Sequence, residues 1–171
     1  MIIDMIEARG RQIAAPKKVI AIICLFVFIL SSVSCAMPED KVLISLGEYE
    51  DHAFYSSGVF QDYTDYAKYY YTSAKVTGNK YLKKIQETDF VAINKHLDDF
   101  EEVLESLKRD ETSSEVVVNY DFNREIIDTE DYIYMESEEH TWGDGHTALV
   151  RYNVYFFDTQ THILYYFHNN I

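Results

Sequence analysis

The chain has 171 residues, of which 47% are apolar and 26% are charged, with only 6 Gly and 2 Pro. This composition excludes collagen-like and broadly disordered chains and predicts one folded domain. The 29 acidic and 15 basic side chains give a net charge of −14. A chain this acidic repels a phosphate backbone, so we expect no nucleic-acid partner.

The beginning of the chain has the pattern of an export signal. Residues 19–30 form an uninterrupted apolar run, with four basic side chains before it and small residues after it. A basic segment, an apolar segment and a small-residue segment follow each other in this order in signal peptides. We therefore predict a signal peptide over residues 1–34, a short tether over 35–41 and a single domain over 42–171. Two alternatives stay open, namely cleavage after Ala36, which gives a secreted protein, and an uncleaved anchor.

Both cysteines of the chain lie in this segment, so the domain is expected to contain no disulfide. The sequence Val33-Ser34-Cys35 resembles the end of a bacterial lipoprotein signal, in which a small residue precedes the Cys that is lipidated. Ser32 departs from that pattern, because Leu is usual at its position. The resemblance covers residues 17–35 only. It implies lipid attachment at Cys35 and a location on the extracytoplasmic face of the cell membrane.

The charge of the mature chain indicates what it binds. Removal of residues 1–34 takes away four basic and two acidic side chains, and it leaves 11 basic and 27 acidic ones, a net charge of −16. This charge predicts repulsion from anionic lipid, so the domain is expected to be tethered to the membrane through its lipid and not adsorbed on it. Electrostatic complementarity makes a basic protein or peptide a candidate further partner, and the favoured alternative is that the charge serves solubility alone.

Helical periodicity dominates the first half of the domain. Between residues 60 and 74, apolar side chains recur at spacings of three and four, which predicts a helix. A shorter helical turn is expected over residues 81–87. The clearest pattern spans residues 90–107, and Asp89 is placed to cap that helix.

A period of two begins at Glu115 and predicts strands. The expected strands cover residues 116–122, 132–135, 148–157 and 163–168. Connections this short, without intervening helices, require antiparallel neighbours. The predicted fold class is therefore α+β, with N-terminal helices over residues 60–109 packed on a C-terminal four-stranded antiparallel β-meander over residues 115–168.

The loop between the second and third expected strands holds His140, Asp144 and His146. Two imidazoles and a carboxylate at this spacing are possible ligands for Zn²⁺, which gives a metal-dependent enzyme as an alternative function. The competing interpretation is a glycine-containing hairpin loop, with Trp142 folded over the sheet edge and the histidines exposed to solvent. We favour the second interpretation and expect no cofactor.

Five tyrosines lie close together between residues 62 and 71. Tyr66, Tyr69 and Tyr71 fall outside the apolar stripe, and with Trp142 they form a candidate binding surface, because tyrosine offers a large contact area with few rotatable bonds. The alternative is that a second layer of the same domain covers these tyrosines.

The sequence contains none of the common catalytic motifs, such as G-x-S-x-G, S-x-x-K, H-E-x-x-H or a glycine-rich phosphate loop. We therefore expect a non-enzymatic, lipid-anchored binding module of the cell envelope with an acidic, tyrosine-rich surface. A structural accessory lipoprotein is a further alternative.

Overall fold

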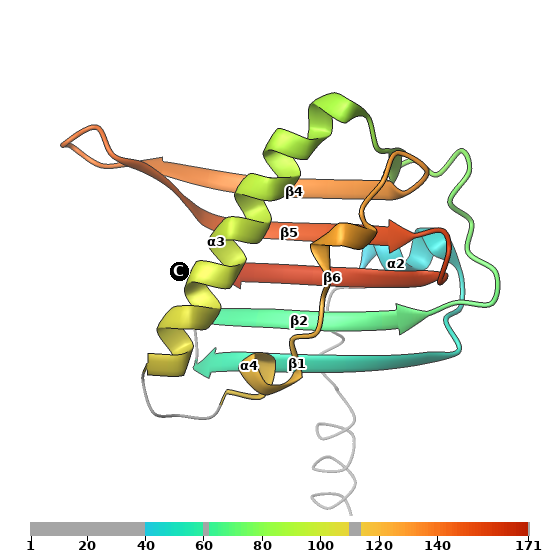
Figure 1. Cartoon of the computed structure of the whole chain (residues 1–171), viewed down its shortest axis with the longest axis horizontal. Coiled ribbons are helices and arrows are strands. Elements are labelled where there is room, and N and C mark those ends of the chain that lie inside the picture. Colours follow the sequence, from blue (N-terminus) through green and yellow to red (C-terminus); the bar gives the residue numbers. More distant parts are fainter. Residues whose placement is uncertain (1–39, 60–61, 110–113, 171) are drawn as a thin grey trace, which may run out of the picture. The chain divides into compact units, whose positions relative to one another are not determined.

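The structure is a computed structural model, and it describes residues 40–59, 62–109 and 114–170. These residues are organised around a six-stranded antiparallel sheet. The strand order is β1-β2-β6-β5-β4-β3 (Figure 1). The strands are β1 (Asp51–Val59), β2 (Asp62–Tyr70), β3 (Lys83–Lys84), β4 (Tyr132–Thr141), β5 (Thr147–Asp158) and β6 (Ile163–Asn170). The last strand of the chain, β6, is thus a central strand of the sheet, with β2 on one side and β5 on the other.

One long helix, α3 (Phe90–Arg109), crosses one face of the sheet (Figure 1). Its buried apolar side chains pack against aromatic residues of β5 and β6. The helix expected over residues 90–107 is therefore confirmed. The expected cap is wrong, because the carboxylate of Asp89 accepts a hydrogen bond at 2.9 Å from the backbone N–H of Gln86, ahead of a short 3₁₀ turn (Glu87–Asp89), and not from α3.

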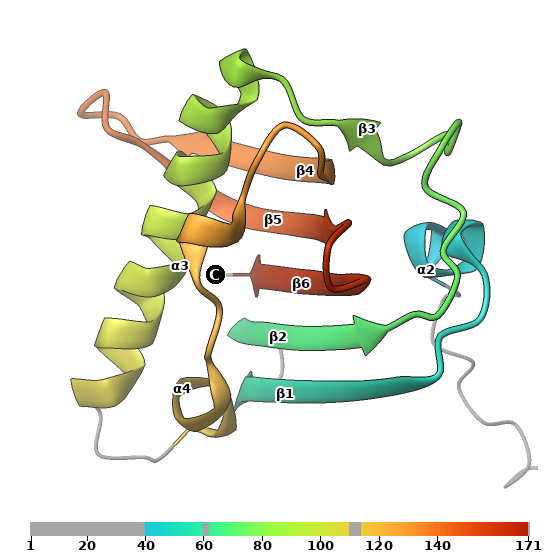
Figure 2. The same ribbon diagram turned by 45° about the vertical axis from the view of Figure 1, so that its right-hand side comes forward.

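A short helix, α2 (Lys41–Leu46), covers part of the opposite face. Asp40 caps it, because its Oδ1 accepts hydrogen bonds from the backbone N–H groups of Val42 and Leu43 at 2.8 and 3.1 Å. Val42 and Leu46 are fully buried and pack on strand residues close to the ends of β2, β5 and β6. Figure 2 shows α2 at one end of the sheet and the β4–β5 hairpin at the other.

The helix expected over residues 60–74 is wrong, because this segment contains β2. The strand pairs with β1 along one edge and with β6 along the other. Both of its faces are covered, as the buried side chains of Tyr66 and Ala67 show on opposite sides. A strand that is buried on both faces loses the alternation of apolar and polar residues, and its aromatic residues then matched a helical spacing by chance.

The strand expected over residues 116–122 is also wrong. The segment begins with a one-turn helix, α4 (Glu115–Asn119), in which Val116 is buried and Val118 is 71% exposed. Its hydrogen bonds are local, for example from the backbone N–H of Tyr120 to the carbonyl oxygen of Val116 at 2.9 Å. The following residues cross over the core, where Phe122 packs against aromatic side chains of β5 and β6.

These two differences overturn the predicted fold class. The sheet has six strands and not four. Strands precede α3 in the sequence as well as follow it, so the chain does not divide into helices over 60–109 and a sheet over 115–168. The turn expected over residues 81–87 contains β3, which pairs with the start of β4. The strands expected over 132–135, 148–157 and 163–168 do lie in β4, β5 and β6.

The compact unit that contains these elements begins at Asp40. The predicted signal peptide, Cys35 and most of the predicted tether lie outside the described residues. In the described part of the chain, no helix combines the length and the apolar character that crossing a membrane requires.

Candidate functional site

The β4–β5 hairpin extends beyond the rest of the sheet (Figure 1). β6 pairs with β5 only from Arg151 onward, so residues 147–149 of β5 pair with β4 alone. The register shifts between Glu138 and Glu139, which makes Val150 of β5 the extra residue of a β-bulge where the hairpin leaves the sheet. Bulges bend a strand and increase its twist.

A cleft of about 510 Å³ lies between α3 and this hairpin. Its apolar lining comes from both elements, and acidic side chains of α3 border it. A volume of this size falls in the range typical of ligand sites. The lining residues are Asp99, Glu102, Val103, Ser106, Arg109, Trp142, His146, Ala148, Leu149 and Val150.

Trp142 forms the aromatic wall of the cleft and is 43% exposed. The turn at the hairpin tip holds it in place, with a hydrogen bond at 2.8 Å from its backbone N–H to the carbonyl oxygen of His146. Gly145 adopts φ +86° in this turn, a value that favours glycine. The rings of His140 and His146 contact the indole at centroid distances of 4.6 and 5.6 Å.

Asp99 has an unusual environment for a carboxylate on a helix surface. Its Oδ2 is buried against the hydroxyl of Tyr152, which interacts with the carboxyl, although the two atoms do not meet in ideal hydrogen-bond geometry. Nε2 of His96 is also buried without a hydrogen-bond partner among the described residues, and its ring contacts that of Tyr152 at a centroid distance of 5.4 Å. Burial raises the pKa of the Asp99 carboxyl above its ordinary value, and the interaction with Tyr152 lowers the pKa and offsets part of that rise.

The carboxylates around the cleft differ in their partners. On α3, the neighbouring Asp98 forms an ion pair with Arg124 at 2.6 Å. Within the described ranges, Asp99 and Glu102 form no ion pair, although both line the cleft. The sequence pattern places all these acidic residues on a solvated helix face. No signal in it distinguishes Asp99 from Asp98, because only the position of the hairpin separates them.

The candidate metal ligands do not converge. Asp144 accepts a hydrogen bond at 2.9 Å from the backbone N–H of His146, and the imidazole of His146 stacks on Trp142. The imidazole of His140 contacts the indole edge to face. Among the residues that the structure describes, no group of three or more His, Cys, Asp or Glu side chains is arranged to hold a metal ion.

Three of the four candidate binding residues are buried. Tyr66 packs under α3 and α4, and its hydroxyl donates a hydrogen bond to Asp121 at 2.7 Å. Tyr69 and Tyr71 belong to the apolar cluster around α2. Further layers of the domain thus cover these tyrosines, which are not accessible to a partner in this structure. Only Trp142 lies at a surface cleft.

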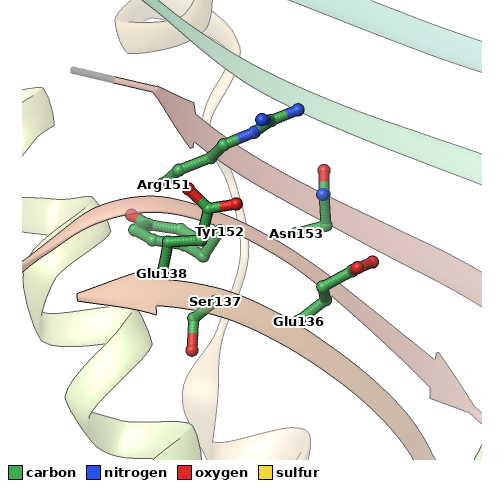
Figure 3. Close-up of a pocket in the computed structure, with 6 residues that line it drawn as sticks. All are labelled: Glu136, Ser137, Glu138, Arg151, Tyr152 and Asn153. Carbon is green, nitrogen blue, oxygen red and sulfur yellow. The ribbon is translucent and has the colours of Figure 1, made fainter.

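A second, smaller cavity of about 170 Å³ lies between β4 and β5. Figure 3 shows that Glu136, Glu138, Arg151 and Asn153 project from the two strands around it. Its volume is below the range typical of sites for small organic ligands. Its lining is also mainly polar, so it lacks the apolar surface that the cleft beside Trp142 provides.

A polar row crosses the α2 side of the sheet. In adjacent strands, Ser56 lies opposite Asp65, and Asp65 lies opposite His168. Nδ1 of His168 and Oδ1 of Asn153 form a hydrogen bond at 2.8 Å. Burial raises the pKa of Asp65 and lowers that of His168. Because the carboxylate lies between the hydroxyl and the imidazole, this order does not form a Ser-His-Asp triad.

Comparison with known proteins gives no match, since no protein family, no curated protein and no solved structure is similar to this chain.

Proposed function

We propose that this protein is a non-enzymatic binding domain, and that the cleft between α3 and the β4–β5 hairpin holds a basic side chain of a protein or peptide partner. The observation that carries this proposal is the pair of carboxylates, Asp99 and Glu102, which line the cleft together with Trp142 and form no ion pair within the described residues. The guanidinium of Arg109 lines the cleft as well, so the attraction for a cation comes from the two carboxylates together with the aromatic wall.

The chemistry of the other lining residues fits the same partner. Lys and Arg side chains bury their methylene groups against apolar surface while the charged end reaches a carboxylate. Val103 and Leu149 offer that apolar surface, and Glu102 adds a second negative charge at the border. The exposed indole of Trp142 is a favourable face for a cation. Together these groups favour a cation on an aliphatic stem over a free metal ion.

Trp142 is the only tryptophan of the chain, so its fluorescence reports on the cleft directly. The test is a titration of the full chain in detergent micelles with a tetra-arginine peptide, and with a tetra-glutamine peptide as the neutral probe. We expect a saturable change in Trp142 emission with the arginine peptide only. The affinity should fall as the salt concentration rises, because salt screens the ion pair.

Two matched variants test which carboxylate binds the arginine peptide. Asp99→Asn should weaken binding of the arginine peptide at least about tenfold, because it removes one of the two carboxylate charges that line the cleft. Asp98→Asn makes the same chemical change one residue away, outside the cleft, and should leave the affinity unchanged. Equal losses in both variants, or an emission that the arginine peptide does not alter, would exclude the cleft as the binding site.

We also propose that Cys35 carries the lipid that anchors the domain to the extracytoplasmic face of the membrane. The support is the signal-like segment that ends at this residue and the start of the compact unit at Asp40, shortly after it. Cys35→Ala should move the protein from the membrane fraction to the medium, or stop its processing. A wild-type protein that is already free in the medium, with Met37 as its first residue, would contradict the anchor.

A further inference from the structure

The two edges of the sheet differ in how they are protected against pairing. At one edge, β3 covers only the start of β4, so residues 135–141 of β4 have no neighbour on their outer side among the described strands. This free segment carries Glu136, Glu138 and Glu139, and it lies opposite the β-bulge, whose extra residue is Val150 of β5. Charged side chains and bulges are the usual means by which proteins prevent an edge strand from pairing.

The opposite edge lacks these features. β1 is nine residues long, pairs with β2 only, and contains no Lys, Arg, Glu or Pro. Its single charged side chain is Asp51, at its first position. An edge strand of this length, with no bulge and with its only charge at its first position, is a template for another strand.

Exposed apolar side chains flank this edge on both faces of the sheet. On the α2 side, Phe54 of β1 is 46% exposed, and Tyr49 just before the strand is 40% exposed. On the α3 side, α4 lies beside β1 and carries Val118, which is 71% exposed. Half of the large apolar side chains that are exposed in the described residues therefore lie along β1. Clusters of this kind mark protein–protein contacts.

We propose that β1 pairs antiparallel with β1 of a second copy of this chain, so that two six-stranded sheets become one. A two-fold axis at Tyr55 places Phe54 opposite Ser56 of the second copy, in a stretch without charges. The two Asp51 side chains then lie at opposite ends of the pair, roughly 27 Å apart at about 3.4 Å per residue. This is well beyond the screening length of about 8 Å at physiological salt, so the two carboxylates do not oppose pairing.

The position of the chain's described start favours a second copy over an unrelated strand. The axis of an antiparallel pair runs perpendicular to the sheet, so each face of the extended sheet is formed by the same face of both copies. Asp40 lies on the α2 face, where the hydroxyl of Tyr155 donates a hydrogen bond to it. Asp40 of both copies therefore lies on the same face of the extended sheet, which is compatible with anchoring both copies in one bilayer. This step rests on the lipid anchor proposed above.

Sedimentation of the full chain in detergent micelles tests the pairing. We expect a protein mass of two copies for the wild type. Phe54→Lys should raise the dissociation constant at least about tenfold, because it brings two positive charges to roughly 7–8 Å of each other across the axis. Val91→Lys adds the same charge at an exposed position of α3 and should remain a dimer.

Two further measurements keep the test decisive. If Phe54→Lys does not fold, as judged by circular dichroism, then Phe54→Ser removes the apolar contact without adding charge and should also weaken the dimer. Hydrogen exchange of β1 amides should slow as the wild-type concentration rises. A wild type that stays a single copy at every concentration, or a dimer that survives both Phe54 variants, overturns the proposal. Binding of the arginine peptide at Trp142 is measured separately and does not depend on this outcome.

Discussion

The two faces of the sheet are covered to very different extents. The 20 residues of α3 span roughly 30 Å, whereas the six residues of α2 span roughly 9 Å, at about 1.5 Å per residue. Under α3 the buried cluster is continuous from β2 to β4. On the other face, apolar residues such as Leu164 and Phe157 occur only near α2. Further along the same strands the polar row of Asp65, His168 and Asn153 takes their place.

This difference shows that the character of a strand can change along its length. In β6, Leu164 and His168 project from the same face, yet one packs against the α2 cluster and the other belongs to the polar row. The polarity of each strand residue therefore follows from what covers that position of the sheet, and it differs between positions of one strand. The following experiments examine the two faces, in order of decreasing effect.

Removal of β6 should have the largest effect because it affects both faces. A chain that ends at Thr161 lacks the strand between β2 and β5, together with Leu164 on one face and Phe167 on the other. It also exposes two apolar strand edges to aggregation. We expect no cooperative thermal transition by circular dichroism. A soluble truncated chain that melts cooperatively would show that β6 is dispensable.

The α3 face should be the more sensitive to a single substitution. Leu97 is 2% exposed, and Leu97→Ala should lower the free energy of unfolding by about 2–5 kcal/mol through lost burial and the cavity that remains. Val91→Ala, on the exposed side of the same helix, should change it by less than about 0.5 kcal/mol. Urea titrations of both variants measure the difference, and equal effects would contradict the assignment of the buried face.

The α2 face should tolerate the same change better. Leu46 is fully buried, but it lies in a one-and-a-half-turn helix that can shift to fill a cavity. We expect Leu46→Ala to cost about 2 kcal/mol, near the lower end of the range for such substitutions. Ile44→Ala, at a 58% exposed position of the same helix, is the control. A cost for Leu46→Ala equal to that of Leu97→Ala in the same urea titration would mean that helix length does not set the difference.

The smallest effect concerns pH and the polar row. Burial lowers the pKa of His168 below its ordinary value of 6.5. The unfolded chain therefore binds a proton that the folded chain does not, as the pH falls from about 6.5 toward the folded-state pKa. Stability should fall with pH in this window, by less than about 1.4 kcal/mol per pH unit for one proton.

His168→Gln removes this titration and provides the comparison. As the pH falls from 7 to 5, the wild type should therefore lose more unfolding free energy than the variant does. Asp65 and Arg151 are the charged groups nearest to the imidazole, and both are present in the variant. Parallel pH profiles for the two proteins would show that His168 does not titrate as its burial implies.

Some elements could be predicted from sequence because one local pattern determines them. The stripe of α3 reflects a single covered face. The first half of β5 likewise has exposed or half-buried residues between buried ones, whereas both of its faces are covered from Val154 onward. β2 and α4 could not be predicted, since the first is covered on both faces and the second lies over the sheet with only Val116 buried. Local periodicity does not report on either situation.

The candidate site shows the same limit. Trp142 was recognisable because it stands in a loop between strands, where an aromatic side chain is unusual. Asp99 was not, because Tyr152 and the hairpin residues around it follow it by about 40 residues or more in the sequence. Tyr66, Tyr69 and Tyr71 are buried for a similar reason, since α2 and α3 cover them from elsewhere in the chain.

The central position of β6 also has a consequence for folding. Until these eight residues take their place, the β1–β2 hairpin has no strand that joins it to β4 and β5. The sheet is therefore completed through contacts between residues far apart in the sequence, and a large share of such contacts makes folding comparatively slow. The two hairpins are made separately by local contacts, and β6 is the strand that turns them into one cooperative unit.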